Sequence, residues 1–254
     1  MIAQKTTLQW LEHRAGVRQL SRHPREYRSK AIELNDRGNA FVAAYGRREI
    51  RGYVGFVDLV GYSTAVVGRS PKEAAAFLRP FLSAVVDAAV EAGALVDKTI
   101  GDEVMFVLPD GEDDGGVPGV LAAGPLLGGL YETQRKLGPQ YSFRLGLSYG
   151  NQYVDRIGGE GYGEWTLVGE SVNLAKRLCA LKELETIDGI GGAFGVLVRE
   201  VDDKKFQSIL QVIAGFSSRM THQIRPGTVE LKGVSPARYA ILSPNPQSTI
   251  DVRE

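Results

Sequence analysis

The sequence is short of the residues that build disulfide frameworks and histidine metal centres. It has one cysteine, Cys179, among 254 residues, which excludes an intramolecular disulfide. Its three histidines, His13, His23 and His222, are far apart and show no metal-ligand spacing. The sequence therefore predicts neither a disulfide-stapled domain nor a histidine-based zinc centre.

Long apolar runs and an excess of one charge are also lacking. No apolar stretch has the length of a transmembrane helix, and residues 1–16 lack the apolar core of a signal peptide. Lys and Arg number 30, and so do Asp and Glu, whereas a general binder of nucleic acid or membrane surfaces has a basic excess. We therefore expect a cytoplasmic protein that binds neither nucleic acid nor membranes.

The composition, with 43% hydrophobic and 24% charged residues, is that of a globular protein able to bury a core. Residues 1–48 differ from the rest because they are rich in arginine and helix formers. Arg14, Arg18 and Arg22 recur at helical spacing. This spacing predicts a short N-terminal helical segment with a solvated basic face, and an arm that contacts anionic ligands is the alternative. Residues 49–254 are expected to form one domain.

Strands and helices alternate along the chain, yet some expected strands follow each other through tight turns. This mixture predicts an α+β sandwich with an antiparallel-rich sheet rather than a doubly wound parallel one. Ser70 and Glu73 predict a capped helix start, with Pro71 in the first turn. The expected strands are 52–60, 95–100, 104–108, 143–149, 153–157, 228–231 and 238–242. The expected helices are 71–92, 120–137, 171–184 and 204–214.

Two aspartates lie next to the ends of expected strands. Asp58 follows a very apolar run, and Asp102 lies in a hairpin turn after Gly101. A carboxylate in apolar company needs a cation or hydrogen bonds. If the two strands are neighbours, both carboxylates meet at one sheet edge, where they suit Mg²⁺ or Mn²⁺ with substrate phosphates completing the shell. The alternative is that each aspartate only caps a turn.

Asn173 and Arg177 are four residues apart in the segment NLAKR, so a helix places them on one face. Arginine offers a planar, permanently charged fork suited to a phosphoryl transition state, and asparagine can orient a ribose through hydrogen bonds. A surface asparagine and a salt-bridging arginine are the alternative for such a pair.

Four more positions have polar features of interest, each with a plain surface alternative. Lys98 lies within an otherwise apolar strand, where it needs an acceptor or a route to solvent. Thr166 supplies a small hydroxyl, and Lys232 is a cation in a short strand. The turn around Gly61 can present backbone N–H groups to phosphate oxygens.

Four of these segments together resemble the catalytic domains of class III adenylate and guanylate cyclases. FVDLVGYS, KTIGDEVMFV, GESVNLAKRL and LKG occur in that family's order and approximate spacing, over about residues 50–242. The resemblance implies a nucleotide cyclase catalytic domain at residues 49–254 with a ferredoxin-like or palm-type sandwich fold. It also implies conversion of a nucleoside triphosphate to a 3′,5′-cyclic monophosphate and pyrophosphate.

The resemblance assigns roles to the matching residues. Two divalent cations, Mn²⁺ or Mg²⁺, would be held by Asp58, Leu59 and Asp102. The substrate would be bound by Phe56, Gly61, Tyr62, Lys98, Thr166 and Lys232. The catalytic residues would be Asn173, which positions the ribose, and Arg177, which stabilises the transition state. In this family the metal aspartates come from one subunit and the Asn/Arg set from the other, so the resemblance implies a homodimer with two shared sites.

The base that the protein would select follows in part from Lys98 and Thr166. Guanine presents N1–H and N2–H₂ donors, which a lysine cannot accept. Adenine fits with Lys98 donating to N1 and Thr166 accepting from N6, and uracil fits with Lys98 donating to O4 and Thr166 accepting from N3–H. The pair therefore leaves both adenine and uracil open.

The chain as a whole is similar to the stand-alone pyrimidine cyclases of bacterial Pycsar anti-phage systems. We expect no sensor domain beside the catalytic domain, and the sequence has FVDLVGYS where the common form is FADIVGFT. This similarity implies a uridylate cyclase whose cyclic UMP acts on a separate effector during infection. An adenylate cyclase is the alternative. A non-catalytic nucleotide-binding module is a further alternative, although such members typically lack a metal aspartate or the Asn/Arg pair, and all four residues are present here.

Overall fold

The computed structural model describes most of the chain beyond the N-terminal segment. The described residues are 48–109, 117–158, 163–187, 189–216, 220–229 and 235–244. The predicted N-terminal helical segment lies outside them except for its last residue, and Lys232 also lies outside them.

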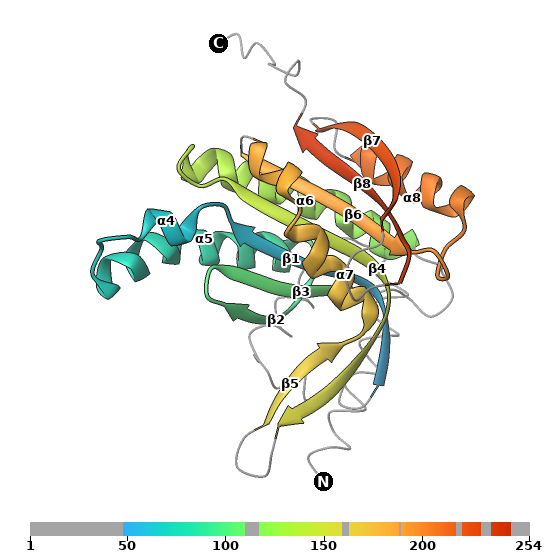
Figure 1. The fold of residues 1–254 in the computed structure, drawn as a ribbon, viewed down its shortest axis with the longest axis horizontal. Helices are drawn as coiled ribbons and strands as arrows, with labels where there is room; N and C mark the ends of the chain where they lie inside the picture. The colour runs from blue at the N-terminus through green and yellow to red at the C-terminus, as the bar shows by residue number, and fades with distance from the viewer. Residues whose placement is uncertain are drawn as a thin grey trace.

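The described strands form one eight-stranded sheet in the order β2-β3-β1-β4-β6-β8-β7, with β5 paired to β4 (Figure 1). The pair β4–β6 is parallel and the other pairs are antiparallel. The predicted α+β fold with an antiparallel-rich sheet is therefore confirmed. The strands are β1 (Arg48–Leu59), β2 (Leu95–Ile100), β3 (Glu103–Pro109), β4 (Phe143–Gly158), β5 (Gly163–Val168), β6 (Ile190–Leu197), β7 (Met220–Val229) and β8 (Ala237–Pro244).

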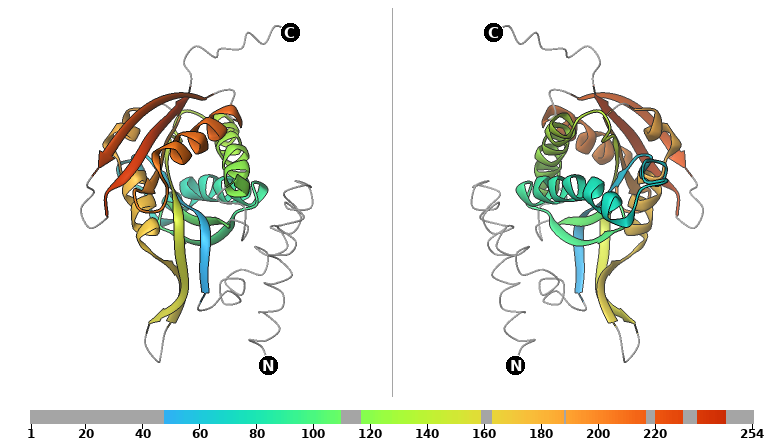
Figure 2. Two further views of the ribbon diagram at one scale, coloured as in Figure 1. Left: turned by 90° about the vertical axis from the view of Figure 1, so that its right-hand side faces the viewer. Right: turned by 90° about the vertical axis from the view of Figure 1, so that its left-hand side faces the viewer.

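Three long helices cover one face of the sheet and one shorter helix covers the other (Figures 1 and 2). The first group is α5 (Pro71–Glu91), α6 (Val117–Leu137) and α8 (Asp203–Phe216), and the opposite face holds α7 (Glu170–Cys179). Two short elements, α4 (Tyr62–Ala65) and η1 (Lys182–Thr186), complete the described fold. None of the helices in the described part of the chain has the length and hydropathy that crossing a bilayer requires.

The predicted start of α5 is confirmed in detail. Ser70 is the N-cap residue, and its hydroxyl accepts a hydrogen bond from the Glu73 amide at 3.3 Å. The Glu73 carboxylate in turn accepts one from the Ser70 amide at 2.8 Å. This capping box satisfies two amide groups that the helix itself leaves free. It therefore fixes where the chain turns back after β1.

Alternation along β1 divides the interior into two cores. Tyr53 and Val57 pack against the long helices, whereas Val54 and Phe56 pack on the side of α7. Because side chains alternate between the faces of a strand, Asp58 extends the α7 side of the sheet. The end of β1 therefore presents a carboxylate beside α7.

The observed strands differ from the predicted ones in three places. The prediction of two separate strands at 143–149 and 153–157 is wrong, because β4 continues through Gly150 and β1 pairs with both of its halves. The strand β5 was not expected, since its sequence lacks clear alternation. The strand β6 was not expected because it contains three glycines. At Gly195 a side chain would overlap Leu178 of α7, so the glycine permits close packing of helix on sheet.

One helix is shorter than the sequence predicts. The expected helix at 171–184 ends at Cys179, and the 3₁₀-helix η1 follows it. Cys179 itself is buried against β4, where its thiol donates to the Arg144 carbonyl oxygen at 3.6 Å. Burial raises the pKa of the Cys179 thiol to about 12. Cys179 therefore packs in the core on the α7 side of the sheet, and its thiol remains protonated and unreactive near neutral pH.

Candidate active site

Asp58 and Asp102 meet at the end of the neighbouring strands β1 and β3. In the antiparallel register Asp58 lies opposite Glu103, so Asp102, in the preceding turn, is one residue away. Gly101 begins this turn with φ of 62°, a conformation that favours glycine. Burial raises the pKa of Asp102, and the charge of Asp58 raises it further. The structure thus brings the two predicted carboxylates together.

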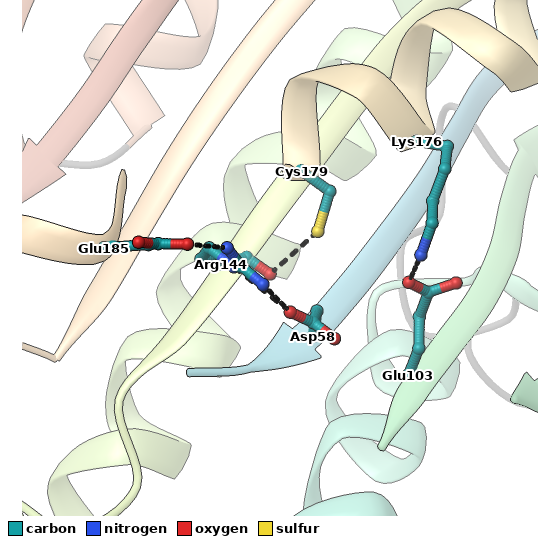
Figure 3. Close-up of polar contacts among 6 residues, drawn as sticks. All are labelled: Asp58, Glu103, Arg144, Lys176, Cys179 and Glu185. Carbon is teal, nitrogen blue, oxygen red and sulfur yellow. Dashed lines mark hydrogen bonds and ion pairs between the residues drawn. The ribbon is translucent and has the colours of Figure 1, made fainter. Parts of the chain in front are cut away.

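An arginine holds Asp58 in this structure. The Arg144 guanidinium, on β4, donates to Asp58 Oδ2 through Nε at 3.1 Å and also through Nη2 (Figure 3). A second ion pair joins Arg144 to Glu185 of η1 at 2.7 Å. The Asp58 and Arg144 side chains are only 16% and 18% exposed, so solvent screens this pair less than a surface salt bridge. Arg144 was not among the predicted site residues, because its contact depends on strand register.

An ion pair between Lys176 and Glu103 holds α7 over the same end of the sheet. The Lys176 ammonium group contacts the buried Glu103 carboxylate (Figure 3), and it also lies 5.6 Å from the centroid of the Phe56 ring. A buried carboxylate is costly without such a partner. This pair therefore constrains the rotation of α7 about its axis.

The predicted catalytic pair lies on the outer face of α7. Asn173 and Arg177 are both exposed, and in the described part of the chain neither side chain has a hydrogen-bond or ion-pair partner. Among the residues that the structure describes, no bond joins either side chain to Asp58 or Asp102. Both side chains are thus exposed on α7, without a partner among the described residues.

The predicted base-reading residues lie together at the junction of β2 and β5. Lys98 forms an ion pair with Glu164 at 2.7 Å, which supplies the acceptor that a lysine in an apolar strand needs. Thr166 donates its hydroxyl hydrogen to Asp97 Oδ2 at 3.3 Å. Asp97 and Glu164 were missed in the sequence, although an aspartate within the apolar run LVDKTI is itself a signal.

The remaining predicted substrate residues surround the end of β1. The side chains of Phe56 and Leu59 are buried in the two cores, so Leu59 can reach a cation only through its backbone. Gly61 has φ of 72° and precedes the short helix α4, and Tyr62 is partly buried against the core. Their roles, and that of Lys232 outside the described residues, stay predictions.

The chemistry of the two aspartates fits a divalent cation. Both supply hard oxygen ligands, and a cation between them relieves the repulsion and the desolvation that raise the Asp102 pKa. The described residues hold no group of three or more His, Cys, Asp or Glu side chains around one point. Mg²⁺ typically takes one or two protein carboxylates and completes its shell with water and substrate phosphates.

The position of α7 depends on Gly146 of β4. A methyl group at this position would overlap the backbone carbonyl oxygen of Ala175 and the backbone amide of Cys179. We therefore expect Gly146→Ala to lower the free energy of unfolding by about 3 kcal/mol and to reduce activity by displacing α7. Gly128→Ala is the matched control, because open space surrounds Gly128 on α6. Chemical denaturation checks both variants, and an unchanged midpoint for Gly146→Ala would contradict the close packing.

The fold matches solved structures of nucleotide cyclases. The adenylyl cyclase CyaB from P. aeruginosa has a TM-score of 0.57 at 18% identity, covering 79% of this chain and 97% of that one. The guanylyl cyclase Cya2 has a TM-score of 0.55 at 19% identity, covering 80% and 98%. The guanylate cyclase domain of RhGC from Catenaria anguillulae, in complex with GTP, has a TM-score of 0.54 at 19% identity, covering 78% and 99%. The protein therefore has the class III cyclase fold.

Curated proteins of similar sequence match only part of the chain. An adenylate cyclase of Anabaena cylindrica is 28% identical over 128 residues, which are 48% of this chain and 26% of that protein. An uncharacterized protein of Mycobacterium tuberculosis is 30% identical over 132 residues, which are 50% of this chain and 23% of that protein. The chain thus spans about a quarter of the length of these relatives. No protein-family model matches the sequence.

Proposed function

We propose that the protein is a nucleotide cyclase that converts a nucleoside triphosphate into a 3′,5′-cyclic monophosphate and pyrophosphate. The observation that carries this proposal is the meeting of Asp58 and Asp102 at one strand end in a class III cyclase fold. Asn173 and Arg177 support it, because they lie exposed on one helix face with no partner among the described residues. The reaction forms a bond from the ribose 3′-oxygen to the α-phosphorus and breaks the bond between the α-phosphorus and the bridging oxygen to the β-phosphate.

Asp58, Asp102 and the Leu59 backbone would hold two divalent cations, Mn²⁺ or Mg²⁺. When bound, such ions activate an attacking oxygen and neutralise phosphate charge. Asp58 must then exchange its contact with Arg144 for a cation, and Glu185 remains as a carboxylate partner for that arginine. The backbone N–H groups around Gly61 and Tyr62 would donate hydrogen bonds to the phosphate oxygens, with Lys232 as a further cation for the terminal phosphates.

The active site would be shared between two copies of the chain. Arg177 of one subunit would stabilise the charge that develops on the α-phosphoryl group bound by the other, and Asn173 would orient the ribose. Exposed apolar side chains on the β4–β5 hairpin, Tyr153, Ile157 and Val168, support a homodimer. Tyr153 and Val168 are cross-strand neighbours, and grouped exposed apolar residues mark contact surfaces.

UTP is the substrate that we propose, with cyclic UMP acting through a cyclic-nucleotide-responsive effector in anti-phage defence. The support is the donor on Lys98, the acceptor on Thr166 and the similarity of the sequence to pyrimidine cyclases. ATP is the second candidate, because the same two groups fit adenine and the Anabaena cylindrica relative is named an adenylate cyclase.

Incubation of the purified protein with Mn²⁺ and each of the four ribonucleoside triphosphates tests the proposal. We expect one equivalent of pyrophosphate for each 3′,5′-cyclic monophosphate formed, with UTP the best substrate and no product from the Asp58→Asn control. Cyclic AMP as the main product would replace the uridylate proposal with the adenylate one. Absence of product from all four nucleotides would contradict the cyclase proposal and favour a non-catalytic nucleotide-binding module.

A further inference from the structure

Asp97 is a buried carboxylate that lies at an irregularity in β2. The pairing of β2 with β3 shifts between Val96 and Lys98, so Asp97 is the inserted residue of a β-bulge. Lys98 lies opposite Met105, whose side chain packs in the core on the α7 side of the sheet. Asp97 and Lys98 both contact β5, through Thr166 and Glu164. The bulge therefore aims two consecutive charged side chains at the same neighbouring strand.

The burial of Asp97 disfavours its charged form. The residue is only 5% exposed, and desolvation raises its pKa despite the nearby charge of Lys98 and the hydrogen bonds from Thr166 and the Leu167 amide. Its Oδ1 atom has no hydrogen-bond partner within the described residues. A buried carboxylate oxygen without a hydrogen bond lowers the stability of the folded protein. Asp97 is thus poorly explained as a residue that stabilises the fold.

The contact with Asp97 fixes the hydrogen-bonding character of Thr166. A threonine hydroxyl has one hydrogen to donate and two lone pairs that accept. Since Asp97 takes the hydrogen, Thr166 Oγ1 can only accept from a ligand. The Lys98 ammonium group can only donate, and one of its three hydrogens faces Glu164. The junction of β2 and β5 therefore presents a fixed acceptor and a fixed donor.

We propose that Asp97 is a positioning residue for base selectivity, which it sets by holding the Thr166 hydroxyl as an acceptor. This inference rests on the proposed cyclase function. Uracil presents the matching N3–H donor beside the O4 acceptor, and adenine presents N6–H₂ beside N1. In the pose that uracil takes, cytosine would place its N3 acceptor at the Thr166 hydroxyl, which only accepts, and its N4–H₂ donor at Lys98, which only donates, so neither group would be paired. In the pose that adenine takes, guanine would likewise place its O6 acceptor at Thr166 and its N1–H donor at Lys98.

The test is the ratio of kcat/KM between the preferred nucleotide and its nearest competitor, which is CTP for UTP and GTP for ATP. Asp97→Asn keeps the shape of the side chain but offers an N–H group to Thr166, which frees the hydroxyl hydrogen to donate outward. We expect this ratio to fall about tenfold, the effect of one mismatched hydrogen bond. Thermal denaturation should give an unchanged or higher Tm, because the variant removes a buried charge.

A double-mutant cycle shows whether Asp97 acts through Thr166. Thr166→Val removes the hydroxyl at nearly constant volume and should lower the ratio by itself, and Asp97→Asn should add nothing in that background. An Asp97→Asn variant that keeps the wild-type ratio would overturn the inference. It would also be overturned if Asp97→Asn lowered the ratio equally in the wild-type and Thr166→Val backgrounds. If Asp97→Asn does not fold, Thr166→Ser supplies the test, because it retains the hydroxyl and should retain the ratio that Thr166→Val loses. Equal loss in both threonine variants would also overturn the inference.

Val96→Ala is the control for loss of stability, since Val96 packs toward the helices on the opposite face. It should lower Tm and leave the ratio unchanged.

A wild-type protein that forms no cyclic product from any nucleotide would refute the cyclase function itself. A wild-type protein that is active and an Asp97→Asn variant with unchanged selectivity would refute only the inference about Asp97.

Discussion

Replacing Asp102 or Asp58 by asparagine should lower kcat/KM for cyclic-nucleotide synthesis by about a thousandfold. Each substitution preserves side-chain shape and removes the charge that would hold the divalent cations. The two variants should differ in stability without metal. Burial and the charge of Asp58 raise the pKa of Asp102, so its charged form is disfavoured in the folded protein. Asp102→Asn removes this charge, so Tm should stay constant or rise. Asp58→Asn removes one of the two carboxylates that the part-buried Arg144 contacts and leaves it with Glu185, so Tm should fall.

Steady-state kinetics and thermal denaturation, each with and without Mn²⁺, check these expectations. The wild-type Tm should rise with Mn²⁺ and a non-hydrolysable nucleotide together, because ligands that bind only the folded state stabilise it. This rise should be smaller in both aspartate variants. An Asp102→Asn enzyme that keeps a tenth or more of the wild-type activity would contradict the assignment of Asp102 as a metal ligand.

Arg177→Ala should lower kcat by a factor of about 10² to 10³ with little change in KM, the loss typical of one group that stabilises transition-state charge. Its Tm should match the wild type, since Arg177 is exposed and no described residue pairs with it. Arg135→Ala is the matched control, because Arg135 is an exposed arginine on α6 whose ion pair joins it to Glu132 within the same helix. Equal activities of the two variants would contradict a catalytic role for Arg177.

Much of the fold could be predicted because local signals agreed with the final structure. The apolar run before Asp58 became β1, and the Ser70–Glu73 capping box marks the start of α5. The strand β6 could not be predicted, because its glycines lower strand propensity, and the reason for Gly195 is visible only in the approach of Leu178 of α7. The prediction that the strand is interrupted near Gly150 was wrong for a related reason, because it too depended on contacts with distant residues. Pairing with β1 and burial of the neighbouring Gln152 keep that stretch extended.

The candidate site could be predicted in part. The positions of Asp58 at a strand end and of Asp102 in a turn are local information, but their meeting was predicted only if the two strands are neighbours, and the β1–β3 pairing supplies that condition. The contacts of Arg144 with Asp58 and of Asp97 with Thr166 join residues 86 and 69 positions apart. Such contacts depend on strand order and register, which cannot be read from a single sequence. The strand β5, whose position brings Thr166 to Asp97, was itself not expected.

Mixing the Asp58→Asn and Arg177→Ala proteins tests most directly whether two subunits share one active site. With random exchange of subunits, half of the dimers are mixed, and each mixed dimer has one site with both wild-type residues. The mixture should therefore reach about a quarter of wild-type activity, although each variant alone is nearly inactive. Activity no higher than the mean of the separate variants, with mixed dimers demonstrated by native mass spectrometry, would contradict the shared site.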